Sequence, residues 1–347
     1  MATAVDVVNA VINTSTALKE NIPLATAATL QTTGGAIMSY TPYMNEFISG
    51  LVNRILFQEA HNMVYENPLK VFKGVDVPYG TDVQDSIANP AVATPYDSTA
   101  MSDVLAPANP DVKTVYYRRN RQDKYKVTVY DEQLTGAFLN AETFSNFVSM
   151  ILNTLTSGDN IDEFKLMKGL VGQAINDGNI GSTTVKTADV THEEFAKSII
   201  TGARAKFLQF QFPSSAYNAY KKMADAAGVA GATPLTTWTS PDRISIMLRA
   251  DVAAYTDVEV LAKAFNMGKA EFLGRQVIVD SFGDTGDAAN TLAIIMDNTA
   301  IRTHDNTYKM AETPYNAATL SRTYFLHHWE TMAYSPFANA HAFIEAK

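Results

Sequence analysis

The chain has 347 residues and a formal net charge of −9, with 46% apolar and 18% charged residues. A folded protein of this length buries about three quarters of its unfolded surface, and its acidic balance argues against a dedicated nucleic-acid binder. The lack of cysteine excludes disulfides, thiolate metal sites and a cysteine nucleophile, and no apolar run approaches the ~18 residues that span a membrane.

Residues 1–40 are expected to form an extended arm. A weak apolar period at the start gives way to the small, uncharged stretch PLATAATLQTTGGA, which offers little bulk for a core. A disordered tail is the alternative. A helix is then predicted from Thr41, a suitable cap, with Pro42 at the first helical position. Its apolar spacing is helical, and it should end before Pro68.

The segment 66–112 changes character. It holds six of the thirteen prolines, two lysines and seven acids. Proline fixes φ and removes an amide donor, which rules out a long helix or a central strand. We therefore interpret this segment as an extended, loop-rich projection that runs outward.

The next stretch concentrates positive charge in this acidic chain. It carries one acid, Asp123, and six basic residues, which are Lys113, Arg118, Arg119, Arg121, Lys124 and Lys126. Tyr125, Val127 and Val129 alternate with polar residues, as in a strand with one packed face. Together, 66–130 is predicted to form a long two-stranded ribbon. Because such a ribbon is marginally stable alone, it should lie against another surface.

Three interpretations of the basic ribbon stay open. It could clamp a neighbouring protein surface, present an ordinary solvated strand face, or bind single-stranded nucleic acid through tyrosines interleaved with arginines. We favour the protein clamp, because the outbound leg and the rest of the chain are acidic and would repel phosphate.

The remaining elements follow in chain order. Apolar stripes on both sides of SGDN (157–160) predict a long helix, and either a continuous helix or a break there is compatible with the sequence. Further predicted elements are amphipathic helices at 191–209 and 258–268, short buried strands at 243–248 and 292–297, a strand at 275–282, and strands at 321–335 and 339–346.

A search for chemistry predicts no catalytic, cofactor or metal site. His327 and His328 are adjacent in a strand pattern, so they should face opposite sides and cannot share a metal ion. Asp284 and Asp287 in GDTGD lack the other ligands of a calcium loop, and we interpret this stretch as a turn.

In this order of elements the chain resembles the major capsid proteins of tailed bacteriophages with the HK97-like fold, most of all those of small short-tailed phages. Two stretches carry the resemblance, NPLKVFKGVDVPYGTDVQDSIANP (67–90) and RTYFLHHWETMAYSPFANAHAFI (322–344). It implies an α+β fold divided into an N-terminal arm (1–40), a leading helix (41–65), an E-loop hairpin (66–130), a peripheral domain with a spine helix (131–180), an apical domain (181–320) and closing peripheral strands (321–347).

The resemblance implies a structural function without catalysis or cofactors. Copies would assemble in the host cytoplasm into hexamers and pentamers of an icosahedral virion shell around packaged double-stranded DNA. The six basic residues would then contact a neighbouring subunit. A portal protein is an implied partner, a scaffolding or decoration protein is left open, and no membrane is involved. An encapsulin-type compartment shell and an unrelated α/β enzyme are the alternatives.

Overall fold

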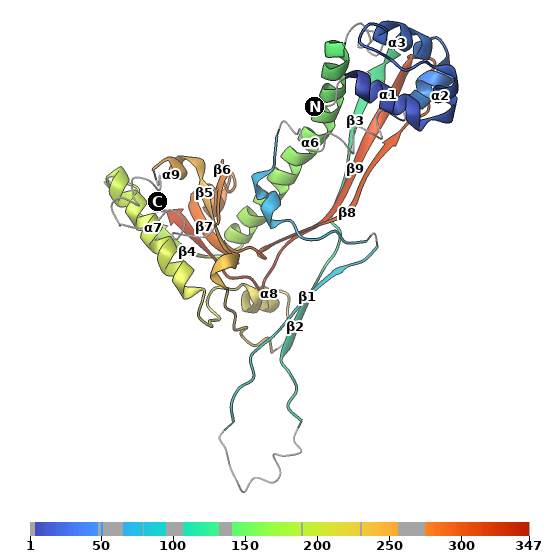
Figure 1. Ribbon diagram of the computed structural model, residues 1–347. Helices are drawn as coiled ribbons and strands as arrows, with labels where there is room; N and C mark the ends of the chain where they lie inside the picture. Colours follow the sequence, from blue (N-terminus) through green and yellow to red (C-terminus); the bar gives the residue numbers. More distant parts are fainter. Residues whose placement is uncertain are drawn as a thin grey trace. The chain divides into compact units, whose positions relative to one another are not determined.

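A computed structural model describes residues 4–47, 50, 65–78, 80–94, 107–131, 141–188, 190–229, 231–255 and 275–346 (Figure 1). The chain folds into two compact units, each built from separate stretches of sequence. Unit 1 comprises Met1–Asn67, Gln122–Glu163 and Thr307–Trp329, and unit 2 comprises Pro68–Arg121, Phe164–Asn306 and Glu330–Lys347. None of the described helices combines the length and apolar character needed to cross a membrane.

The N-terminal residues are helical, so the prediction of an extended arm is wrong. Unit 1 begins with the helices α1 (Ala4–Thr14), α2 (Thr16–Asn21) and α3 (Leu30–Met38). Their apolar side chains pack together in one core, so a small number of them is enough to hold these helices in unit 1. The buried members from these helices are Val8, Val11, Ile12, Leu18, Leu30 and Ile37. Residues 41–47 are also helical, and most of the rest of the predicted leading helix lies outside the described residues.

A continuous helix, α6 (Ala141–Asn176), runs through SGDN and settles the open question there. The polar residues that resemble a new helix start are instead held by tertiary partners within unit 1. Asp159 accepts a hydrogen bond from Nδ1 of His328 at 2.7 Å, and Nδ2 of Asn160 donates to the carbonyl oxygen of Tyr65 at 2.9 Å. Because their polar groups are satisfied inside the fold, these residues need not end the helix.

The three-stranded sheet has the order β3-β9-β8, with β3 at Arg121–Tyr130, β9 at Ser321–Tyr334 and β8 at Ile301–Glu312. Alternation along β3 is confirmed, since Val129 is buried in the unit 1 core while Lys124 and Lys126 are exposed. The opposite orientations of the adjacent histidines are also confirmed: His328 is buried, and His327 lies between neighbouring aromatic rings on the more open side.

Unit 2 is centred on a five-stranded sheet of order β4-β10-β7-β5-β6. Its strands are β4 (Gly181–Val185), β10 (Ala340–Glu345), β7 (Thr291–Asp297), β5 (Ile244–Arg249) and β6 (Arg275–Val279). Strand β7 is antiparallel to β10 and β5, whereas β4 and β6 are parallel to their neighbours. The strands predicted near 243–248 and 292–297 are confirmed. They do not alternate because both faces of the sheet are covered.

One face of this sheet packs against α6 and the short 3₁₀ helix η1 (Pro68–Phe72), and the other packs against α7 (His192–Gln209). The predicted helix at 191–209 is confirmed, and a reciprocal capping box between Thr191 and Glu194 starts it. Unit 2 also contains α8 (Tyr220–Ala226), η2 (Pro241–Arg243), α9 (Ala250–Tyr255) and α11 (Gly286–Ala289). The helix predicted at 258–268 lies outside the described residues.

The two C-terminal strands, expected to close one peripheral domain, belong to different sheets. Strand β9 lies in the three-stranded sheet, but β10 lies between β4 and β7 in unit 2. Strand β8, expected within the apical segment 181–320, lies instead in the three-stranded sheet. Strands β9 and β10 are internal in their sheets, and each pairs with a strand from a distant part of the chain that local sequence patterns do not identify.

A buried histidine in β10 predicts pH-dependent stability. Burial, with a smaller contribution from Lys206, lowers the pKa of His341 from 6.5 to about 4, and its Nε2 lies 2.8 Å from Oγ1 of Thr183. The unfolded chain therefore binds this proton more readily. The stability contributed by the neutral His341 is fully present above pH 6.5. It decreases by about 2 kcal/mol as the pH drops toward 4.

Urea unfolding of the unassembled subunit at pH 7 and pH 4.5 tests this contribution. His341→Gln removes the titration while keeping a polar side chain, so the variant should lose about 2 kcal/mol less than the parent protein between the two pH values. Equal losses in both proteins would show that His341 does not contribute to the acid sensitivity.

Candidate functional site

The β1–β2 hairpin is the candidate functional site. Strand β1 (Val83–Ala88) pairs antiparallel with β2 (Val112–Tyr117), from Val83 opposite Tyr117 to Ala88 opposite Val112. Figure 1 shows both strands running away from the five-stranded sheet of their own unit. The predicted 66–130 ribbon is therefore shorter than expected. After residues 118–120 the chain enters β3, which pairs with β9 instead of the outbound leg.

The two faces of the hairpin differ in charge. Asp85 and Lys113 lie on the face that is turned toward the body of unit 2 and is partly buried. The opposite face is exposed and uncharged, and it carries Gln84, Ser86, Ala88, Val112, Thr114 and Tyr116. The hydroxyls of Ser86 and Thr114 form a cross-strand hydrogen bond at 3.0 Å on this exposed face. Strand alternation thus directs the charges inward and leaves a neutral surface outside.

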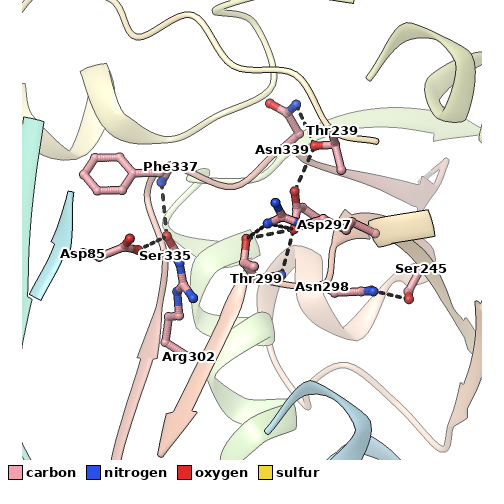
Figure 2. A network of polar contacts seen from close by, with 11 residues as sticks. Asp85, Thr239, Ser245, Asp297, Asn298, Thr299, Arg302, Ser335, Phe337 and Asn339 are labelled. Carbon is pink, nitrogen blue, oxygen red and sulfur yellow. Dashed lines mark hydrogen bonds and ion pairs between the residues drawn. The ribbon is translucent and has the colours of Figure 1, made fainter. Parts of the chain in front are cut away.

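An acidic residue in the middle of β1 anchors the hairpin. Oδ2 of Asp85 accepts hydrogen bonds from Nη2 of Arg302 at 2.9 Å and from Oγ of Ser335 at 3.2 Å (Figure 2). Directly beside this pair, burial raises the pKa of Tyr117 to about 12. The phenol therefore stays neutral at physiological pH, and β2 ends on a buried aromatic ring.

A second anchor lies at the far end of the strands. Nζ of Lys113 donates to Asp111 at 2.5 Å and to Thr233 at 2.7 Å, and Asn89 donates to Asp111 at 2.7 Å. The backbone amide of Thr236 donates to Oδ1 of Asn89 at 2.8 Å. Hydrogen bonds from Lys113, Asn89 and Thr233 lower the pKa of Asp111 to about 2, so it stays ionised. The hairpin is therefore tied to its own unit at both ends of the paired region.

The loop that receives Asn89 is itself held by a buried carboxylate. Asp297 accepts from the hydroxyl of Thr239 at 3.0 Å, from the amide and hydroxyl of Thr299 at 2.8 Å each, and from Arg243 at 3.2 Å (Figure 2). Asn339 donates to Thr239 at 3.2 Å. This network joins the ends of β7 and β10 to the loop, so the docking surface for the hairpin is preorganised.

A groove of about 370 Å³ lies between β1 and this loop, and the exposed ring of Trp238 forms part of its wall. Its two carboxylates each face a guanidinium group, Asp85 with Arg302 and Asp297 with Arg243. Both carboxylates are engaged by basic side chains of their own unit and serve as anchors. The arrangement supports a mechanical role for this region.

The structure separates the six predicted contact residues. Lys113 belongs to the anchor above. Arg121 is buried in unit 2, where Nη1 forms an ion pair with Oε2 of Glu330. The other carboxylate oxygen of Glu330 lies 3.1 Å from Nζ of Lys73, which also pairs with Asp305 at 2.7 Å. Lys113 and Arg121 therefore stabilise their own subunit.

The other four basic residues are more open. The side chain of Arg118 is 84% exposed and pairs with Asp82 at 3.1 Å, and Arg119 next to it is half-buried. Both precede β3 in unit 2. Lys124 and Lys126 are exposed on β3 in unit 1. The positive stretch therefore divides into two surfaces on different units.

The alternation of side chains along a strand would have predicted the burial of Arg121, which was instead expected to contact a neighbouring subunit. Arg121 lies an even number of positions before Tyr125, Val127 and Val129, the residues predicted to face the core. It therefore shares their face, and its burial follows. The same rule places Lys113 on the inward face of β2 with Tyr117.

Comparison with known proteins agrees with this architecture. The profile of the family described as "Phi29-like phage major capsid protein" matches residues 8–344. The major capsid protein of Bacillus phage PZA is 33% identical over 346 residues, covering 98% of this chain and 72% of the relative. That of Bacillus phage GA-1 is 31% identical over 342 residues, covering 98% and 69%. That of Streptococcus phage Cp-1 is 25% identical over 345 residues, covering 97% and 93%.

Solved capsid structures share the fold. The capsid structure of Staphylococcus phage Andhra has a TM-score of 0.65 at 18% identity, covering 82% of this chain and 86% of that chain. A chain from the structure of the head fiber and inner core protein gp22 of bacteriophage P68 has a TM-score of 0.60 at 16% identity, with the same coverage. The predicted α+β fold of the HK97-like capsid type is thereby confirmed. The chain belongs to the Phi29-like phage major capsid proteins.

Proposed function

We propose that copies of this chain form the hexamers and pentamers of an icosahedral shell that encloses packaged double-stranded DNA. Membership of a major capsid protein family carries the proposal, since a capsid is built from copies of its shell protein. The same membership favours a phage shell over an encapsulin-type compartment or an enzyme. The role needs no catalysis, and a portal protein is a proposed partner. Scaffolding and decoration proteins are optional ones.

We further propose that the β1–β2 hairpin rests on a neighbouring subunit of the same capsomer. Its paired strands are tied to unit 2 by Asp85 and Lys113, so their position on their own unit is fixed. Four basic residues could then align the contact: Arg118 and Arg119 beside the hairpin, and Lys124 and Lys126 on β3. Because the chain is acidic, these charges would meet an acidic neighbour, which favours orientation and register more than affinity.

Charge reversal tests the proposed contact. Two variants are needed, Arg118→Glu with Arg119→Glu, and Lys124→Glu with Lys126→Glu. Both should fold, because exposed charges contribute little to stability. Assembly into capsomers or shells, measured by size exclusion with light scattering, should fall at least about fivefold in any variant whose residues face an acidic neighbour. Raised salt should restore part of it, since it screens the new repulsion.

The two double variants are controls for each other, because they alter the same number of charges on different units. A drop in one alone would identify the contact surface. Normal assembly of both, combined with loss of DNA retention in a filter-binding assay, would instead support a nucleic-acid role for the basic stretch.

A further inference from the structure

Leu320 occupies an unfavourable backbone conformation at the turn between β8 and β9. Its φ is 46°, and among the described residues it is the non-glycine residue with positive φ. Asn316 and Ser321 are bridged by backbone hydrogen bonds in both directions, at 2.9 and 3.3 Å, with four residues between them. Glycine, asparagine or aspartate normally takes a left-handed position in such a turn, whereas leucine is strained there because its Cβ crowds the backbone.

Burial within the subunit does not account for this leucine. Its side chain is 55% exposed, so it adds little to the core of unit 1. A strained position that a smaller or polar residue would occupy more easily, combined with an exposed apolar side chain, points to a role outside the subunit.

Leu320 belongs to a group of neighbouring residues without charged side chains, which we call the turn patch. It consists of residues 314–320, which carry no charged side chain, and the exposed ring of Tyr130 at the end of β3. The backbone amide of Asp131 donates to the carbonyl oxygen of Leu320 at 3.0 Å, which keeps the turn next to β3. Asp131 is itself engaged by the hydroxyl of Tyr315 at 2.7 Å. Aromatic and apolar side chains without charge are typical of the buried centre of a protein interface.

We propose that Leu320 is a contact residue that inserts its side chain into a second copy of this chain. This inference rests on the proposed shell function. Each copy carries a net charge of −9, so copies repel one another over most of their surface. An uncharged patch adds no repulsion of its own when two such copies approach, and the strained turn holds the leucine outward at that point. The occupant is therefore another subunit.

Two variants, Leu320→Asn and Leu320→Gly, distinguish the effect of backbone strain on stability from the effect of the side-chain contact on assembly. Both residues adopt positive φ readily, so strain is relieved in each. The melting temperature of the unassembled Leu320→Asn subunit should rise by about 1–3 °C, and that of Leu320→Gly should change less, because glycine also loosens the unfolded chain. Assembly of both variants, measured by light scattering, should nevertheless fall at least about threefold, since the apolar contact is lost.

Leu24→Asn is the matched control, because Leu24 is 54% exposed in the same unit and does not have positive φ. This control should assemble like the parent protein. Normal assembly of Leu320→Asn would overturn the contact, and so would a lower melting temperature, which would show that the leucine serves its own subunit. If the parent protein itself failed to assemble, the proposed shell function would fall first and the contact with it.

Discussion

Replacing Arg121 with methionine should destabilise the unassembled subunit by about 3–5 kcal/mol, the usual effect of removing one partner of a buried ion pair. The side chain of Arg121 is 3% exposed, and that of its partner Glu330 is fully buried. Without the guanidinium, Glu330 keeps its ion pair with Lys73, which also pairs with Asp305. Chemical unfolding monitored by circular dichroism measures the loss.

Arg118→Met is the matched control, because the same residue type three positions earlier is 84% exposed. Its stability should change by less than about 0.5 kcal/mol. Adding Glu330→Gln to Arg121→Met should recover part of the loss, because it removes the buried carboxylate that has lost its guanidinium partner. Equal stability of the two single variants would mean that the Arg121 pair contributes no more than a surface pair. Loss of shells in Arg121→Met is expected as well, and for this reason it would not identify a subunit contact.

Adding one methyl group inside α6 should have opposite effects at two nearby glycines. At Gly172 the new Cβ would lie 2.2 Å from the carbonyl oxygen of Phe282, and backbone atoms cannot rotate away as a side chain can. We expect Gly172→Ala to destabilise the subunit by about 2–4 kcal/mol through overpacking, although alanine is the better helix former. Gly169→Ala should stabilise it by about 0.5–1 kcal/mol, because the new methyl group would reach no described atom within 4 Å.

Melting temperatures of the two unassembled variants test this pair. The values should move in opposite directions from that of the parent protein, which excludes a general effect of glycine replacement. A rise in both would mean that the loop at Phe282 shifts easily and that the close approach to α6 is not required. The result therefore also reports how rigidly this loop packs on the helix in unit 2.

Secondary structure was predictable from the sequence where neighbouring residues alone determine it. The buried strands β5 and β7 were predictable because short apolar runs without alternation require cover on both faces. The start of α7 was predictable because Thr191 and Glu194 satisfy its first amides without help from elsewhere. The alternation in β3 was predictable as well, and applied to Arg121 it would have placed that arginine inside.

Long-range pairing was beyond the sequence. The segment 66–130 was expected to be one ribbon, but β3 pairs with β9. This pairing depends on a strand about 200 residues later in the chain, as the hydroxyls of Thr128 and Thr323 show at a distance of 2.9 Å. The same holds for β10, which pairs with β4 and β7 in unit 2. The partner surface of the hairpin and the contact at Leu320 stay predictions.

The sequence by itself determined the absence of cysteine chemistry and the positions of most strands, because these depend on composition or on local periodicity. The order of its elements and two stretches carried the resemblance to phage capsid proteins, and that resemblance implied the α+β class. Only the tertiary structure decided the continuity of α6, the formation of α1, α2 and α3 and the division of the basic residues between interior and surface. In each case marginal local preferences were overruled by burial and by partners distant in sequence, such as His328 for Asp159 and Glu330 for Arg121.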